Sequence, residues 1–232
     1  MSNKTVVIHQ PDFMPYLGFF QRLLVADLYV VLDNVQYLSG SKSWHNRDRI
    51  KTREGAAWLT VPTQKAPQKT AIGQILIAED GGWRRRHLNL LEHNYRKAPF
   101  IAESWPALEE LYSGGETRLA DFTLASIRML MRAFDLGTTL VAASELQAQG
   151  ASNELLADIL EKTGATAYLS GVGARDYFDP APFQRVGVTV NWQDFRHPEY
   201  PQLHGAFAPF LSSIDLLLNC GKDTARSILR SC

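Results

Sequence analysis

The residues best suited to chemistry follow three apolar segments that are predicted to be strands. The segments His9-Gln10-Pro11-Asp12, Asp33-Asn34-Val35-Gln36 and Ser170-Gly171-Val172-Gly173 each come directly after such a run. In open parallel sheets, ligands bind outside the carboxyl ends of the strands. If these strands are parallel and adjacent, their polar residues converge on one edge of the sheet and form a single site.

His9 is the first candidate for a catalytic group. It could act as a general base, bind a phosphate or ligate a metal. The helix that follows would present its N-terminus, which favours anions, to the same place. The loop lacks the glycine pattern of a P-loop or a dinucleotide fingerprint. A structural histidine bonded to a neighbouring carbonyl is the alternative.

Asp33 ends an apolar strand, where a carboxylate is costly unless it is paired. It could bind an amine, a ribose or Mg²⁺, or it could cap the turn onto Val35, because Asp-Asn begins turns readily. The sequence leaves both roles open.

Three loops carry further candidates, each with an ordinary loop as the alternative. Residues 43–49, SWHNRDR, combine an indole with two guanidiniums, which bind carboxylate or phosphate in bidentate fashion. Residues 170–177 are small enough to admit a ligand close to the backbone. They form no nucleophile elbow, because Tyr168 stands where that motif needs glycine. Residues 196–202, RHPEYPQ, are predicted to be extended and could line a pocket.

The composition excludes several classes of protein. The chain has 232 residues, 45% of them apolar, with 24 Lys and Arg against 24 Asp and Glu, as in a soluble globular protein. We therefore expect no nucleic-acid partner, no membrane insertion and no signal peptide. The cysteines Cys220 and Cys232 have no metal or redox spacing, so a cytoplasmic, reducing location is the default.

The balanced charge hides an asymmetry. Residues 1–100 carry 14 Lys and Arg against 8 Asp and Glu, and the basic excess lies in Lys42–Arg53 and Arg84–Lys97. Such a field suits an anionic small molecule or an acidic carrier, although solvated cationic surfaces are equally ordinary.

Strand-like and helix-like segments alternate along the chain. Apolar, β-branched runs predict strands at residues 5–8, 28–32, 58–61, 138–143, 166–169 and 188–192, and residues 72–77 could pair with 58–61. Helical spacing or caps predict helices at 16–26, 83–96, 119–134, 152–162 and 212–221, the last opened by a capping box from Ser212 to Asp215. We expect one α/β domain over residues 1–232, with a mainly parallel sheet flanked by helices and a helical insertion or cap at about 82–136.

Five blocks of the sequence resemble the WbqC-like family of bacterial proteins, in order and over nearly the whole chain. They are VVIHQPDFMPYLGFFQRLLVADLYVVLDNVQY, SWHNRDRIKT with WLTVP, HNYRKAPF, GATAYLSGVGARDY and HPEYPQLHGAFAPFLSSIDLLLNCG. Tyr16 stands where many relatives have Trp. The opening strand is also similar to the nucleotide-binding start of the HUP-type fold, so we expect a Rossmann/HUP-like sheet, although the usual His-x-Gly-His turn is absent.

The family resemblance implies a role in O-antigen or other surface-polysaccharide synthesis, with a glycine- or aminoacyl-transferase activity. By position, it points to His9, Gln10, Pro11, Asp33, Gln36, Trp44, Asn46, Arg47, His93, Tyr95, Ser170, Gly171, Tyr177, His197, Tyr200 and Gln202.

Our first hypothesis is a transferase that passes an acyl or aminoacyl group to an amine or hydroxyl of an activated sugar. His9 would be the base, Asp33 would orient it or hold the acceptor, and Arg47 with the Ser170-Gly171 loop would bind an anionic substrate. That substrate would be a nucleotide sugar or an acyl or aminoacyl donor, free or carrier-bound. Gln10 and the backbone amides of that loop would stabilise the oxyanion.

Two other hypotheses remain open. The first is a nucleotide-dependent ligase or nucleotidyltransferase, which would need a nucleotide with Mg²⁺ near Asp33 as its cofactor. The second is a non-catalytic module that docks an acidic carrier on Lys42–Arg53. The sequence establishes no cofactor and no metal ligand.

Overall fold

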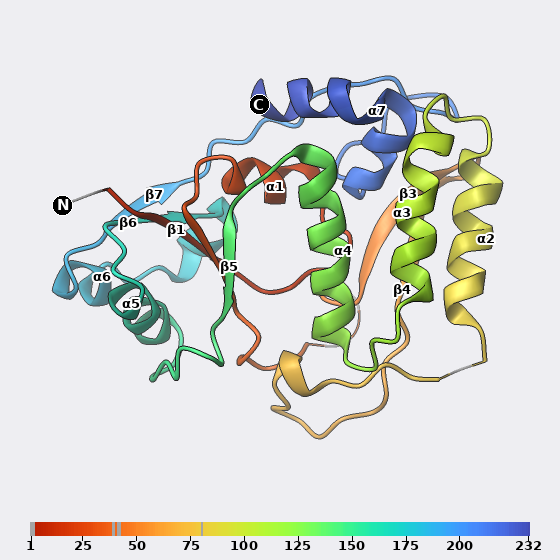
Figure 1. Ribbon diagram of the computed structural model, residues 1–232. Coiled ribbons are helices and arrows are strands. Elements are labelled where there is room, and N and C mark those ends of the chain that lie inside the picture. Colours follow the sequence, from red (N-terminus) through yellow and green to blue (C-terminus); the bar gives the residue numbers. More distant parts are fainter. Residues whose placement is uncertain (1–2, 39, 41–42, 80) are drawn as a thin grey trace.

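Five parallel strands form the central sheet of the computed structural model, which describes residues 3–38, 40, 43–79 and 81–232 (Figure 1). The strands are β1 (Thr5–His9), β2 (Leu28–Val31), β5 (Thr139–Ala142), β6 (Ala167–Ser170) and β7 (Thr189–Trp192), in the spatial order β5-β2-β1-β6-β7. The chain therefore adds β2 and β5 on one side of β1, and then β6 and β7 on the other side. This reversal places a crevice at the carboxyl ends of β1 and β6.

Alternate residues of the strands face two different layers of helices. Val6 and Ile8 of β1 belong to the cluster formed with α5 (Asn153–Lys162) and α6 (Ala181–Arg185). Val7 belongs to the larger cluster, which includes α1 (Leu17–Leu23). The prediction of an α/β fold with a mainly parallel sheet flanked by helices is confirmed.

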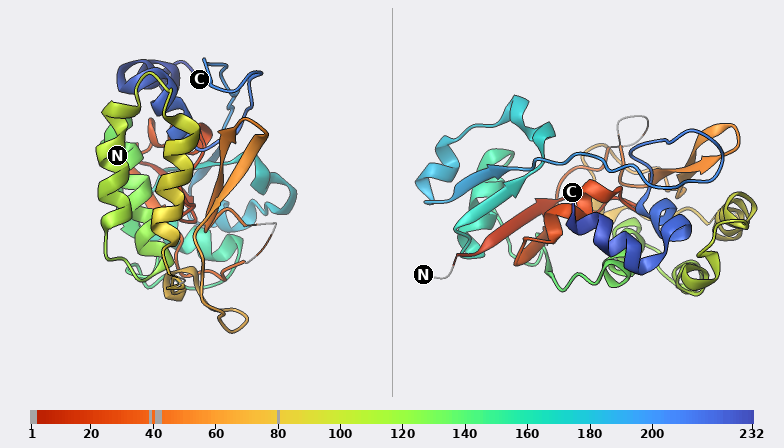
Figure 2. Two further views of the ribbon diagram at one scale, coloured as in Figure 1. Left: turned by 90° about the vertical axis from the view of Figure 1, so that its right-hand side faces the viewer. Right: turned by 90° about the horizontal axis from the view of Figure 1, so that it is seen from above.

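The crossover from β2 to β5 is long and carries most of the second layer. It contains the hairpin β3 (Arg47–Thr52) and β4 (Gly55–Thr60), the 3₁₀ turn η1 (Ile72–Gln74), and the helices α2 (Trp83–Tyr95), α3 (Ile101–Ser113) and α4 (Leu119–Phe134). The last helix, α7 (Ser213–Arg230), packs on α3 and α4 (Figure 2). The three crossover helices lie within the predicted insertion at about 82–136.

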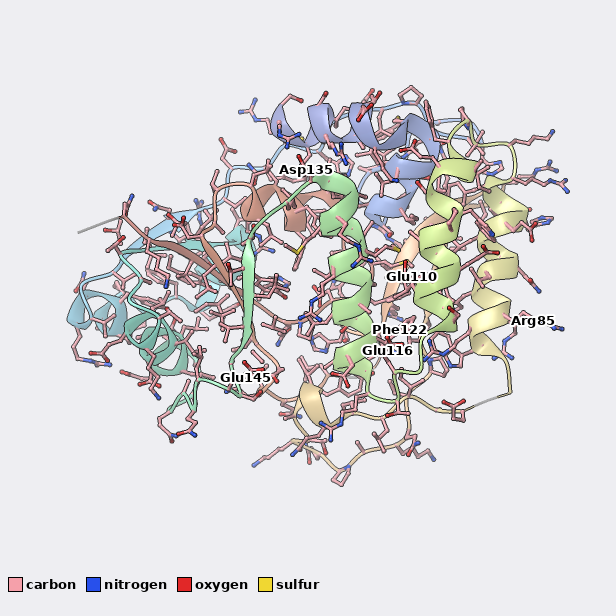
Figure 3. The ribbon with its side chains drawn as sticks, viewed as in Figure 1. Arg85, Glu110, Glu116, Phe122, Asp135 and Glu145 are labelled. Carbon is pink, nitrogen blue, oxygen red and sulfur yellow. The ribbon has the colours of Figure 1, made fainter. Side chains whose placement is uncertain are left out.

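The sequence pattern of α4 explains its bounds. Phe122, Ile127 and Leu130 are fully buried at helical spacing, and the helix was predicted over the same residues. It ends where Asp135 adopts the left-handed conformation, with a φ of 58° (Figure 3). No helix in the described ranges is long and apolar enough to cross a membrane.

Four local predictions are wrong. Residues 72–77 form η1 and isolated bridges, and the partner of β4 is β3, which looked like a charged loop. The last helix bends at Gly221, with a φ of 72°, and then continues to Arg230. Ser212 does cap it by accepting a hydrogen bond from the backbone N–H of Ile214, but the carboxylate of Asp215 accepts from Tyr95. Ser152, expected to cap α5, makes no capping hydrogen bond.

Candidate functional site

A cavity of about 700 Å³ lies at the carboxyl ends of β1 and β6. His9 and Gln10 line it from the end of β1, and Ser170, Gly171 and Val172 line it from the end of β6. Leu32 and Val35 line it from the end of β2, so residues from all three predicted segments meet at one cavity, as expected. Its volume lies in the ordinary range for sites that bind small molecules.

His9 presents one ring nitrogen to ligands and uses the other to hold its position. Its Nδ1 donates to the carbonyl of Gln10 at 2.9 Å, because a carbonyl can only accept. The proton is therefore assigned to Nδ1, which leaves a lone pair on Nε2. The side chain is 31% exposed and lines the cavity, so a ligand can approach.

The surroundings of His9 keep it neutral. Burial first, and then the positive charge of Arg22 and the nearby His45, lower the pKa of His9 well below its ordinary value, against a raising effect of the bond to Gln10. A neutral imidazole with a free lone pair is the form that can accept a proton from a substrate.

The loop that carries His9 into α1 is fixed by three distant segments. The N–H of Phe13 donates to the carbonyl of Trp44, and the N–H of Met14 donates to Oγ of Ser126 on α4. The carbonyl of Pro15 accepts from the N–H of Ser213 at the start of α7. These bonds hold the loop rigid, which a catalytic geometry needs.

Gln10 is oriented by a second histidine. His45 Nε2 donates to Gln10 Oε1 at 2.7 Å, and burial lowers the pKa of His45 to about 4, so that this ring is also neutral. Since the oxygen of Gln10 is engaged, its amide N–H groups are the ones available to a ligand. They suit an oxygen that gains negative charge.

A second cavity of about 410 Å³ shares His9, Tyr16 and Trp44 with the first. It adds the carboxyl groups of Asp12 and Asp48, which the larger cavity lacks. Asp12 Oδ2 lies 3.6 Å from His9 Nδ1. Burial raises the pKa of Asp12 to about 7, against the lowering effect of Arg22, and raises that of Asp48 well above its usual range. His9 thus stands between two cavities of different polarity.

Asp12→Asn is expected to stabilise the protein at pH 8 but not at pH 4. The pKa of Asp12 is higher in the folded state than in the unfolded state, so folding favours the protonated form and stability is lost as the pH rises through 7. Asparagine carries no charge at any pH, so the variant does not bury a carboxylate at pH 8. Its free energy of unfolding should therefore exceed that of the natural protein by about 1–3 kcal/mol at pH 8.

Urea denaturation at both pH values measures this difference. Asp223→Asn is the matched control, because the Asp223 side chain is 99% exposed. If the advantage of Asp12→Asn is the same at pH 4 and pH 8, the carboxyl group is not held protonated by burial.

Arg22 is a site residue that sequence reasoning missed. It lies in the last turn of α1, it is only 4% exposed, and it lines the larger cavity. Gln193 was also missed. It lines the same cavity, and its amide donates to the carbonyl of Gly18 and to Gln21 Oε1. An arginine in the last turn of a mostly apolar helix was the only signal for Arg22, and helical spacing gave no reason to place it at a cavity.

The structure divides the sequence-predicted residues into two groups. Those that line the two cavities are His9, Gln10, Trp44, Ser170, Gly171 and Tyr177. Those that line neither are Asp33, Gln36, Asn46, Arg47, His93, Tyr95, His197, Tyr200 and Gln202.

Asp33 stabilises the neighbouring strand end. Its two carboxylate oxygens accept from the N–H and the Oγ of Ser144, which follows β5, at 2.9 and 2.6 Å. Neither role considered from the sequence, a ligand contact or a cap onto Val35, describes this arrangement. The side chain of Asp33 lines neither of the two cavities. Within the described ranges, no three His, Cys, Asp or Glu side chains form a metal-ligand set.

Most of the basic segment Lys42–Arg53 lies beside the cavities rather than in them. The guanidinium of Arg47 stacks on Trp58 at 4.2 Å, and the amide of Asn46 donates to the carbonyl of Val61. Lys42 lies outside the described residues. The second basic cluster includes Arg85, which points away from the helices (Figure 3).

The remaining candidates serve other parts of the molecule. Gln36 forms an isolated backbone bridge with Ala71, and His93 is exposed on α2 beside a separate cavity. His197 donates from Nδ1 to the carbonyl of Pro198, and its ring packs on Tyr200 and Phe210.

Tyr95 and Gln202 belong to a buried network that joins the C-terminal segment to β3. The hydroxyl of Tyr95 donates to Asp215 Oδ1 at 2.7 Å and accepts from the N–H of Lys51 at 2.9 Å. The ammonium of Lys51 donates to Gln202 Oε1 and to the carbonyl of Ala206. This network accounts for these two residues without a ligand.

Tyr95→Phe is expected to lower the free energy of unfolding by about 1–3 kcal/mol, because it leaves Asp215 and the N–H of Lys51 without their partner. Ligand binding should be unchanged, since Tyr95 lines neither cavity. Urea denaturation and a binding titration measure the two effects. A large loss of binding with unchanged stability would return Tyr95 to the list of substrate contacts.

Comparison with known proteins gives a family and one curated relative. The sequence model of the WbqC-like protein family matches residues 10–227. The chain is 33% identical over 233 residues to Uncharacterized protein Rv1507c of Mycobacterium tuberculosis (strain ATCC 25618 / H37Rv), and the match covers 99% of each chain. No solved structure is significantly similar. With five sequence blocks in order and a match over most of its length, the chain belongs to the WbqC-like protein family.

Proposed function

We propose that the protein is a transferase that moves an acyl or aminoacyl group onto an amine or hydroxyl of an activated sugar or a similar small acceptor. The observation that carries the proposal is the position of His9. A neutral imidazole with a free Nε2 stands where a cavity lined by Arg22 meets a cavity lined by Asp12 and Asp48.

The smaller cavity receives the reacting group of the acceptor. An acceptor amine or hydroxyl can donate hydrogen bonds to Asp12 and Asp48 in the smaller cavity. Its nitrogen or oxygen attacks the acyl carbon while His9 Nε2 takes its proton, and the leaving group departs with the bonding electron pair. The protonated His9 then returns the proton to the leaving group or to solvent.

The oxygen of the acyl carbonyl becomes negative during the attack and needs hydrogen-bond donors. The amide N–H groups of Gln10 are adjacent to His9 and are not engaged by His45. Asp33 and Arg47 have no part in the proposal, because their side chains are bonded elsewhere.

The choice of an activated sugar rests on the family, whose resemblance implies surface-polysaccharide synthesis. A role in O-antigen synthesis and a cytoplasmic location belong to the same proposal. Glycine transfer is one form of it, since glycine is a small aminoacyl group.

Mass spectrometry of reaction mixtures tests the proposal. The purified protein is incubated with UDP-glucosamine as an amine acceptor or UDP-N-acetylglucosamine as a hydroxyl acceptor. Acetyl-coenzyme A or glycyl-coenzyme A, a thioester of glycine, serves as donor, and glycine with ATP is included to test the competing ligase. We expect the acceptor to gain one acetyl or glycyl group at a rate proportional to enzyme concentration.

The same panel separates the competing functions. If no combination gives a product, the transferase assignment to activated sugars is wrong. If glycine transfer requires ATP and releases pyrophosphate, the protein is better described as a nucleotide-dependent ligase.

A further inference from the structure

The guanidinium of Arg22 is buried without a protein partner. The residue is 4% exposed, and within the described part of the chain it makes no hydrogen bond and no ion pair. Its Nε is fully buried and unpartnered, and the face of the Phe19 ring lies 5.7 Å from the guanidinium carbon. A buried charge without a counter-ion is costly, so such a group is retained where a ligand supplies the opposite charge.

The guanidinium faces the loop that follows β6. A Cβ atom built on Gly171 would come within 3.5 Å of Arg22 Nη1, so the arginine lies directly against this part of the cavity wall. Arg22 also lies close enough to His9 and Asp12 to influence both titrations, although it forms no ion pair with Asp12. Asp12 lines the smaller cavity and is absent from the lining of the larger one.

The start of α5 adds a second positive element to the same cavity. Ser152 and Asn153 line the cavity, and α5 has ten residues. Ser152 makes no capping hydrogen bond, and Asn153 uses its side-chain amide to donate to the carbonyl of Tyr177. The first backbone N–H groups of α5 are therefore not capped by a side chain, and a helix N-terminus of this kind favours anions.

We propose that Arg22, together with the uncapped N-terminus of α5, binds a phosphate or diphosphate group of a nucleotide-sized ligand in the larger cavity. A guanidinium binds phosphate oxygens in bidentate fashion, and a helix N-terminus adds backbone donors. One part of this inference rests on the proposed function. If the protein is the proposed transferase, the ligand in the larger cavity is the phosphate-bearing substrate of the transfer.

Binding of such an anion would also change His9. In the free protein, Arg22 is one of the causes that lower the pKa of this histidine. A bound phosphate neutralises the charge of Arg22, so the pKa of His9 rises toward its ordinary value when the substrate is present. The base is then stronger in the complex than in the free protein.

Calorimetry and thermal melting with UDP, pyrophosphate and acetate test the proposal on the full chain. We expect UDP and pyrophosphate to bind and to raise the melting temperature, and acetate to do neither. Arg22→Met should weaken phosphate binding at least about tenfold. Arg22→Lys, which keeps the charge but not the planar fork, should have an intermediate effect.

Stability of the unliganded variants gives a second readout. Arg22→Met should be at least as stable as the natural protein, because it removes a buried, unpaired charge and keeps an apolar chain of similar length. Arg128→Gln is the matched control. It removes one positive charge from an exposed position of α4 and should leave phosphate binding unchanged.

Four outcomes would overturn the proposal. They are no binding of UDP or pyrophosphate at millimolar concentration, equal binding by Arg22→Met, acetate binding as tight as that of pyrophosphate, and a marked loss of unliganded stability in Arg22→Met. The proposed function fails separately. A protein that binds UDP through Arg22 but transfers no acyl group keeps this site and loses the transferase assignment.

Discussion

His9→Ala should reduce turnover at least about 10²-fold while the protein stays folded. The expected loss is large because Nε2 of His9 is the group that removes the acceptor's proton in the proposed reaction. The fold should persist because the side chain is 31% exposed and its one hydrogen bond goes to the adjacent residue, Gln10.

Two further variants distinguish a catalytic role from a structural one. His9→Gln keeps a polar side chain of similar reach but cannot act as a base at neutral pH, so its turnover should be as low as that of His9→Ala. His204→Gln is the control, because His204 donates to the carbonyl of Asn94 and lines neither cavity. Initial rates, with circular dichroism and melting curves for each variant, measure the effect.

A different result would change the assignment of the base. Full turnover in His9→Gln would show that no proton passes through this side chain. Equal losses in melting temperature and turnover for His9→Ala would show that the imidazole mainly supports the loop.

The sequence predicted the strand ends well because each strand is short, apolar and followed by polar residues. β1, β2 and β6 were recognised in this way, and residues from all three strand ends line the larger cavity, with Leu32 and Val35 coming from the end of β2. The sequence predicted that β1 and β2 are parallel strands of one unit, but it did not predict that β5 is the second neighbour of β2. β5 lies beside β2, so the end of β2 is one strand away from the point of reversal, and Ser144 after β5 bonds to Asp33.

Residues whose partners are far along the chain were the hardest to interpret. β3 reads RDRIKT and looks like a charged loop, yet Lys51 and Asp48 are buried in it. Lys51 is satisfied by acceptors more than 150 residues away. Arg22 is the converse case. It lines the larger cavity and has no hydrogen-bond partner among the described residues, and no sequence pattern displays the absence of a partner.

Packing well outside the cavities also supports the loop that carries His9, and Phe13 takes part in it. Phe13 is fully buried, four residues after His9. Its ring stacks on Phe122 of α4 with centroids 5.7 Å apart, and it contacts His87 of α2 at 6.2 Å. Figure 3 labels Phe122 on α4. The loop at the end of β1 is thereby joined to the helices of the long crossover.

Phe13→Ala should lower the free energy of unfolding by about 3–5 kcal/mol, because it leaves a cavity among aromatic rings that cannot close around it. Phe13→Leu fills most of that space and should cost less than about 1.5 kcal/mol. Val25→Ala is the control at a position that is 63% exposed, where a change within about 0.5 kcal/mol is expected. Urea denaturation with a common m-value measures all three.

The same variants show whether fold and site are coupled through this ring. If Phe13 fixes the loop, the folded fraction of Phe13→Ala should turn over more slowly than Phe13→Leu under conditions where both are native, because His9 loses its fixed position relative to the two cavities. A small loss of stability in Phe13→Ala would mean that the hydrogen bonds of the loop to Trp44, Ser126 and Ser213 are sufficient without the aromatic contact. In that case, the crossover helices would hold the site through those bonds alone.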